Sequence, residues 1–249
     1  MQETKEQTII EHLMEFKNRL IYCIIAVLMA FLISYYFSEN IYEFLLRPLV
    51  EIFGENSDKR IIYTSLTEAF TTYLRLSFLS AIFFAFPFIA IQIYLFIAPA
   101  LYKKEKKFIL SVMIACPTLF FFGSMMVYEM VLPMAFKFFI SFQSINPIGS
   151  LPIELEAKIG EYLSLIVWMV FAFGIAFQLP VLLICLVKFG ILSVAGLRAK
   201  RKYWIVIIFA VAAIITPPDV ISQIALAVPM ILLYEISILI SSKITKNND

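Results

Sequence analysis

Six long apolar segments, separated by short charged stretches, constrain this 249-residue chain more than any other feature. A helix needs about 20 apolar residues to cross the hydrocarbon core of a bilayer. The mean hydropathy of +0.92 agrees with such crossings, and the 62% hydrophobic share is well above the usual composition of soluble domains. The sequence therefore predicts an all-α polytopic membrane protein with residues 1–249 in a single integral membrane domain. The expected spans are approximately 20–37, 72–97, 108–130, 160–187, 203–216 and 220–240.

Lys and Arg residues are distributed unequally between the two sides of these spans. Fourteen lie on one side and six on the other. Loops on the cytoplasmic side carry an excess of Lys and Arg, so both termini are predicted to be cytoplasmic, in agreement with an even number of spans. The net charge of only +2 gives no electrostatic support for nucleic-acid binding.

The fifth predicted span is unusually short. Tyr203 to Thr216 is 14 residues, which as a helix covers only about 21 Å of a core about 30 Å thick. This mismatch indicates local thinning of the bilayer or shelter against other protein. Thr216 and Gln223, near the outer end of the hairpin, are candidates to hydrogen-bond a docked partner helix. The alternative is that they bond only within the hairpin.

Two carboxylates lie at the predicted cytoplasmic rim. Glu15 precedes the first span in H-L-M-E-F-K-N-R-L, and Glu105 is the only acid in F-I-A-P-A-L-Y-K-K-E-K-K. A carboxylate at a basic membrane surface offers a docking point for an incoming cation. Two of them predict a receptor for a ligand that carries paired positive charge.

Two further polar residues fall inside predicted spans, where such residues are costly and often functional. Glu235 lies about one turn from the cytoplasmic end of the last span, where it could instead reach the interface or hydrogen-bond Ser237 or Tyr234. Gln178 lies in the fourth span, two residues before Pro180. A groove-lining polar site and local hydrogen bonding are both open for this side chain.

The sequence holds no constellation typical of an enzyme. It lacks a phosphate-binding Walker loop, an H-E-x-x-H pair and a G-x-S-x-G elbow. His12 is the only histidine, and the three cysteines lie singly in apolar segments. We therefore expect no enzymatic activity, no cofactor and no metal site.

Five motifs together point to a family. They are H-L-M-E-F-K-N-R-L, F-I-A-P-A-L-Y-K-K-E-K-K, A-F-G-I-A-F-Q-L-P, L-R-A-K-R-K-Y and I-I-T-P-P-D-V-I-S-Q. In this order and spacing, from His12 to Glu235, the chain resembles the TatC family, the multi-span core of the twin-arginine protein translocase. The resemblance implies a cupped bundle of six transmembrane helices. Family positions with less defined roles are matched by Pro48, Phe70, Gln92, Tyr128 and Asp219.

The resemblance also implies a function. Members recognise twin-arginine signal peptides on folded precursor proteins and export them with the proton-motive force. Their partners are TatA- and TatB-type single-span proteins and further TatC copies, in the inner membrane of a bacterium or in an organellar membrane, with the bacterial inner membrane as our prediction. The implied signal-peptide region comprises Glu15, Glu105, Phe96 and Lys17.

Two positions depart from the family pattern. Lys17 stands where arginine is common, and Gln178 stands where glutamate is common. Lysine keeps the charge but not the two-point geometry of a guanidinium, and glutamine does not titrate. The alternative function considered, a secondary transporter of small solutes, predicts internal pseudo-symmetry, and no repeat is evident in the sequence.

Overall fold

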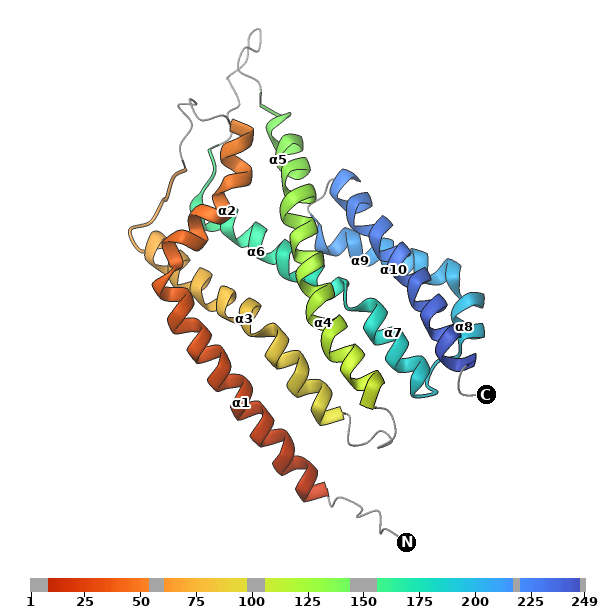
Figure 1. Ribbon diagram of the computed structural model, residues 1–249. Coiled ribbons are helices and arrows are strands. Elements are labelled where there is room, and N and C mark those ends of the chain that lie inside the picture. Colours follow the sequence, from red (N-terminus) through yellow and green to blue (C-terminus); the bar gives the residue numbers. More distant parts are fainter. Residues whose placement is uncertain (1–8, 54–60, 98–105, 144–155, 217–219, 247–249) are drawn as a thin grey trace.

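A computed structural model of the chain describes residues 9–53, 61–97, 106–143, 156–216 and 220–246 (Figure 1). Within these ranges every extended regular element is a helix. The predicted all-α architecture is thereby confirmed. The elements are α1 (Ile9–Tyr36), α2 (Ser38–Phe53), α3 (Glu68–Ile97), α4 (Lys106–Met126), a π-helical turn (Val127–Val131), α5 (Leu132–Ile140), α6 (Ile159–Ala176), α7 (Leu179–Lys188), α8 (Val194–Ala199), α9 (Arg201–Ile215) and α10 (Val220–Lys246).

Five of the described segments are long and apolar enough to cross a membrane. They are Ile10–Tyr36, Glu68–Phe96, Leu110–Ile140, Ile159–Lys188 and Val220–Ile244. The remaining predicted span, the fifth, is α9, whose 15 residues reach only about 22 Å. The structure therefore keeps the short helix expected from the sequence.

Several helices extend beyond the predicted spans. α1 begins at Ile9 instead of residue 20, because its polar first turns interrupt the hydropathy but not the helix. The third span continues from α4 through the π-helical turn into α5, ten residues past its predicted end at 130. The fourth span is broken at Phe177–Gln178, where Pro180 occupies the first turn of α7.

α6 forms the centre of the bundle. In the span formed by α6 and α7, 44% of the most apolar stretch is buried inside the protein. In α1 the corresponding share is only 6%. Ile166, Met169 and Phe173 of α6 are fully buried. α1 lies at the edge of the molecule, beside α3 (Figure 1).

Small residues bring α4 and α6 close together. A Cβ atom built on Gly174 would lie 2.6 Å from the Phe120 ring, and one on Gly123 would lie 2.7 Å from the Phe177 ring. The Ser124 hydroxyl also donates to the Val170 carbonyl across the same contact, at 3.1 Å. Close approach at small residues, with hydroxyl hydrogen bonds, is how helices pack in membranes.

The two ends of the bundle differ in the elements that they gather. The first turns of α1 and α4 lie at the lower end in Figure 1, together with the last turns of α3, α7 and α10. At the other end, the Ile62 amide donates to the Ala157 carbonyl and the Ile159 amide to the Ile62 carbonyl, each at 3.0 Å. This short bridge joins the segment that precedes α3 to the segment that leads into α6. The candidate site lies at the opposite, lower end.

Candidate functional site

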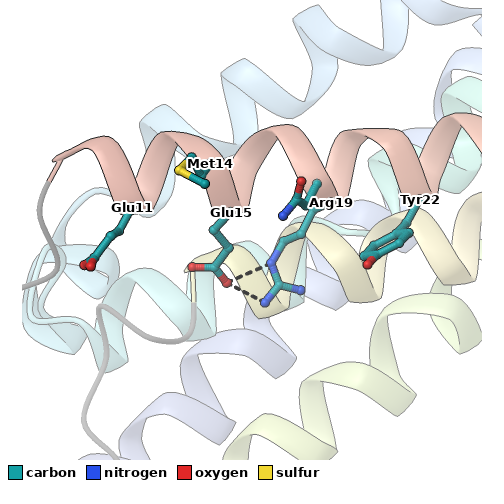
Figure 2. A pocket seen from close by; sticks show the side chains of 6 residues that line it. Glu11, Met14, Glu15, Arg19 and Tyr22 are labelled. Carbon is teal, nitrogen blue, oxygen red and sulfur yellow. Dashed lines mark hydrogen bonds and ion pairs between the residues drawn. The ribbon is translucent and has the colours of Figure 1, made fainter.

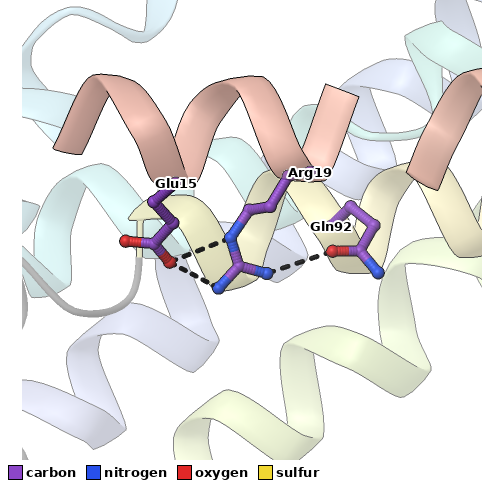
Figure 3. Close-up of polar contacts among 3 residues, drawn as sticks. All are labelled: Glu15, Arg19 and Gln92. Atoms are coloured by element: carbon purple, nitrogen blue, oxygen red, sulfur yellow. Dashed lines mark hydrogen bonds and ion pairs between the residues drawn. The ribbon is translucent and has the colours of Figure 1, made fainter. Parts of the chain in front are cut away.

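The side chains of Glu15, Arg19 and Gln92 meet at the lower end of the bundle, where α1 packs on α3 (Figure 3). Arg19 donates from Nε and Nη2 to Glu15 Oε1, at 2.9 and 2.6 Å. Its Nη1 donates to Gln92 Oε1 at 3.0 Å. Glu15 and Arg19 are four residues apart, so one face of α1 presents both, with the acid toward the N-terminus, which is the favourable order.

The ion pair is only partly shielded from solvent. The side chains of Arg19 and Glu15 retain 22% and 24% of their exposure. Both hydrogen bonds from Arg19 end on Oε1, so Oε2 takes no part in the pair. The carboxylate is therefore partnered and still reachable from outside.

A hollow runs along this face of α1. Figure 2 shows Glu11, Glu15, Arg19 and Tyr22 extending from the same side of the helix. These residues are three or four apart, so they form one stripe. The complete lining is Glu11, Met14, Glu15, Asn18, Arg19 and Tyr22. The lining combines two carboxylates and the Arg19 guanidinium with Met and Tyr side chains, so the hollow suits a ligand with cationic and apolar parts.

Phe96 lies next to this site and connects α1 to α3. Its ring stacks on His12, with ring centroids 4.4 Å apart, and packs at a tilt against Phe16 at 5.3 Å. The contacts hold the first turns of α1 against the last turn of α3. His12 and Phe16 were not singled out from the sequence, although their spacing of four places them on one helix face.

The other predicted residues of this region are placed differently. Lys17 is exposed and does not line the hollow. It is two residues from Glu15, which is a rotation of about 200° around the helix, so it lies on the opposite face of α1. Glu105 lies outside the described residues. Arg19, by contrast, was not predicted to be part of the site. The E-x-x-x-R spacing in the sequence is the signal that would have found it.

Gln178 lies at the break between α6 and α7 and bonds across to α4. Its Nε2 donates to the Cys116 carbonyl at 3.0 Å and to the Gly174 carbonyl at 3.4 Å. The Cys116 thiol donates in turn to Gln178 Oε1 at 2.9 Å. The amide is thus hydrogen-bonded mainly across to α4, and a groove-lining role for Gln178 stays a prediction.

Glu235 pairs with the start of α9. Arg201 Nη2 donates to Glu235 Oε2 at 2.7 Å, and the side chains are 49% and 39% exposed. The hydrogen bonds to Ser237 or Tyr234 that the sequence left open as an alternative for Glu235 do not form. Ser237 donates to the Leu233 carbonyl and Tyr234 to the Leu197 carbonyl. A cation 34 residues away gives no periodic signal in the sequence.

Thr216 and Gln223 both bond within the hairpin of α9 and α10. The Thr216 hydroxyl is buried and donates to the Ala212 carbonyl at 2.9 Å. Gln223 Nε2 donates to the Phe209 carbonyl at 3.2 Å. Both contacts lie within the hairpin, as in the alternative that the sequence left open. Docking of a partner helix stays a prediction.

The described part of the chain contains no group of three or more His, Cys, Asp or Glu side chains that could hold a metal ion. The polar groups that it does bring together are ion pairs and amide hydrogen bonds between helices. Fold and site therefore define a polytopic α-helical membrane protein that presents a partnered carboxylate at one end of its bundle.

Comparison with known proteins places the chain within a family. The family profile described as Sec-independent protein translocase protein (TatC) matches residues 11–229. The chain belongs to the TatC family. The alternative of a small-solute transporter receives no support from these relationships.

Relatives and solved structures agree along nearly the whole chain. A Sec-independent protein translocase protein TatC from Rickettsia prowazekii is 49% identical over 230 residues, which are 92% of this chain and 90% of that protein. The TatC protein of Escherichia coli is 37% identical over 94% of this chain and 88% of its own length. A crystal structure of the twin-arginine translocase receptor TatC superposes with a TM-score of 0.76 and 36% identity, covering 93% of this chain and 99% of that one.

Proposed function

We propose that this protein is the receptor subunit of a twin-arginine translocase and that it binds the arginine pair of signal peptides at the rim formed by α1 and α3. The observation that carries the proposal is the Glu15 carboxylate, which already accepts two hydrogen bonds from a guanidinium in a partly exposed position. The site therefore has the geometry that an arginine ligand requires.

Chemistry favours arginine over other cations at such a carboxylate. A guanidinium is planar and presents donors in a rigid fork, so it can bind a carboxylate through two hydrogen bonds at once. Met14 and Tyr22 also line the hollow, which places apolar side chains beside the charged group. A signal peptide with arginines next to an apolar stretch matches both parts. Glu105, outside the described residues, is proposed as the second carboxylate.

The membrane orientation follows from the charges at the two ends of the bundle. The first turns of α1, the last turns of α7 and the short α8 lie toward the end that is lower in Figure 1, and these elements carry Arg19, Lys188 and Arg198. By the positive-inside bias this end is cytoplasmic. We place the protein in the bacterial inner membrane with both termini in the cytoplasm, where signal peptides arrive.

The protein acts here by binding and assembly, not by catalysis. TatA- and TatB-type single-span proteins and further TatC copies are the proposed partners, with the proton-motive force as the energy source. α9 is too short to span the core alone, so a neighbouring helix beside the α9–α10 hairpin would cover its exposed face.

Co-purification tests the proposal directly. The full-length protein in native membranes is mixed with a folded precursor that carries a twin-arginine signal peptide, and with the same precursor carrying two lysines. We expect retention of the first and loss of the second. Equal retention of both precursors would contradict arginine recognition.

A further inference from the structure

We infer that Arg19 is an internal competitor for Glu15, so that the chain's own guanidinium occupies the receptor rim until an incoming arginine displaces it. This inference rests on the proposed function of Glu15 as a signal-peptide contact. It assigns to Arg19 a role in setting the affinity of that contact.

The competition follows from the acceptor sites on the carboxylate. Each carboxylate oxygen has about two lone-pair sites. Nε and Nη2 of Arg19 both end on Oε1 of Glu15, so the acceptor capacity of this oxygen is used. An incoming guanidinium that needs both oxygens for a two-point bond must first remove Arg19. Displacement, and not simple addition, is therefore the binding step.

Gln92 strengthens the hold on Arg19 from a second helix. Its side-chain oxygen accepts from Arg19 Nη1 at 3.0 Å (Figure 3). The guanidinium is thus fixed at three nitrogens, two by α1 and one by α3. A pair within one helix would leave Arg19 free to swing into solvent, whereas the bond to α3 keeps it over the carboxylate.

The pair is nevertheless weak enough to open. Both side chains keep more than a fifth of their exposure, and partly exposed ion pairs are screened by water. The usual strength of such ion pairs means that Glu15 is unpaired from Arg19 for about one half to one sixth of the time. Because apparent affinity scales with the fraction of competent protein, Arg19 should weaken a guanidinium ligand that needs both oxygens of Glu15. An ammonium makes a single contact and can use the free Oε2, so Arg19 should weaken a lysine ligand less.

Peptide binding to the full-length protein in lipid nanodiscs tests this inference. The probe is a fluorescent peptide with two adjacent arginines followed by an apolar stretch, and a second peptide has two lysines instead. Arg19→Gln should raise the affinity for the arginine peptide about 2- to 6-fold, with a smaller rise for the lysine peptide. Gln92→Leu, which keeps Arg19 but removes its anchor, should give a smaller rise.

Two controls separate competition from other effects. Arg198→Gln removes one positive charge from α8, away from the hollow, and should leave the affinities nearly unchanged. Arg19→Lys keeps the charge but loses the fork, so its affinities should lie between wild type and Arg19→Gln. Thermal unfolding in detergent shows whether each variant is folded.

Three outcomes would overturn the inference. They are weaker binding in a folded Arg19→Gln variant, which would make Arg19 a positioning residue; an equal gain in Arg198→Gln, which would reveal a general charge effect; and a gain for the lysine peptide as large as that for the arginine peptide. Failure of the proposed function gives a different result, because the wild type and the Glu15→Gln variant would then bind the arginine peptide equally well.

Discussion

Gln178 and Cys116 are joined by two hydrogen bonds that run in opposite directions. The glutamine amide donates to the Cys116 carbonyl, and the Cys116 thiol donates to the glutamine oxygen. The pair connects α4 to the break between α6 and α7, where Pro180 leaves the backbone without a donor. The Gln178 side chain thus contributes to helix packing.

Replacing Gln178 should therefore change stability more than transport. Gln178→Leu removes both bonds, and hydrogen bonds between membrane helices contribute about 0.6 kcal/mol each. We expect the free energy of unfolding to fall by about 1 kcal/mol, measured in detergent, with transport partly retained. Gln178→Glu should keep transport. A double-mutant cycle with Cys116→Ala should show coupling, and complete loss of transport in a stable Gln178→Leu protein would contradict this role.

Loss of Glu15 should abolish signal-peptide crosslinking while the protein remains inserted. A hydrogen bond to a charged group contributes about 1.5–3 kcal/mol, so Glu15→Ala should weaken peptide affinity roughly 10- to 100-fold. The same result is expected for Glu105→Ala. Glu15→Gln is the matched variant, because it keeps the shape of the side chain. Unchanged crosslinking in the double variant Glu15→Ala/Glu105→Ala would remove both residues from the site.

The contact between α4 and α6 should be intolerant of a single methyl group. A Cβ on Gly174 would meet the Phe120 ring at 2.6 Å and the Ser124 hydroxyl at 2.9 Å. Overpacking of this kind costs about 1–3 kcal/mol, so Gly174→Ala should lower the unfolding temperature clearly. Gly160→Ala is the control, since its Cβ meets the movable Glu68 carboxylate at 3.2 Å. Equal melting of the two variants would show that α6 shifts more easily than this contact indicates.

The ion pair between Arg201 and Glu235 should contribute little to stability. Its side chains are 49% and 39% exposed, and exposed pairs typically contribute about 0.2–1 kcal/mol. Glu235→Gln is expected to change the free energy of unfolding by less than about 1 kcal/mol, with the difference shrinking as salt is raised. A larger loss that does not depend on salt would indicate that Glu235 has a further partner.

Cysteines on α9 should report where a partner helix docks. The side chains of Val206 and Ile214 are 67% and 78% exposed, whereas Ile208 is 1% exposed. With the three native cysteines replaced by serine, Val206→Cys and Ile214→Cys should form disulfides with a TatB-type helix in intact membranes. Ile208→Cys is the buried control. Capture of the partner by cysteines on α3 alone would disprove docking at the hairpin.

The sequence predicted the membrane class, the helical fold and the short α9 because these follow from the length of apolar runs. The true start of α1 was missed for the same reason. The apolar stretch of the first span begins only after the polar residues near the N-terminus, but the helix itself begins earlier, at Ile9. The ion pair between Glu15 and Arg19, one turn apart, stabilises this polar part of the helix.

Contacts between distant segments could not be predicted in the same way. Gln92 is 73 residues from Arg19, and Gln178 is 62 residues from Cys116. Such partners depend on how the helices pack, which local periodicity does not encode. The rim carboxylates could be proposed from the sequence because isolated acids in basic surroundings have a chemical meaning on their own, and their role stays a prediction.

The shallow burial of α1 has a consequence for how this receptor can diverge. The helix that presents Glu15 has only 6% of its most apolar stretch inside the protein, whereas the tight glycine contacts lie between α4 and α6. On the proposed function, substitutions along the stripe of Glu11, Glu15, Arg19 and Tyr22 should therefore change peptide binding more than they change folding. Binding specificity could then evolve while the glycine contacts between α4 and α6 stay constant.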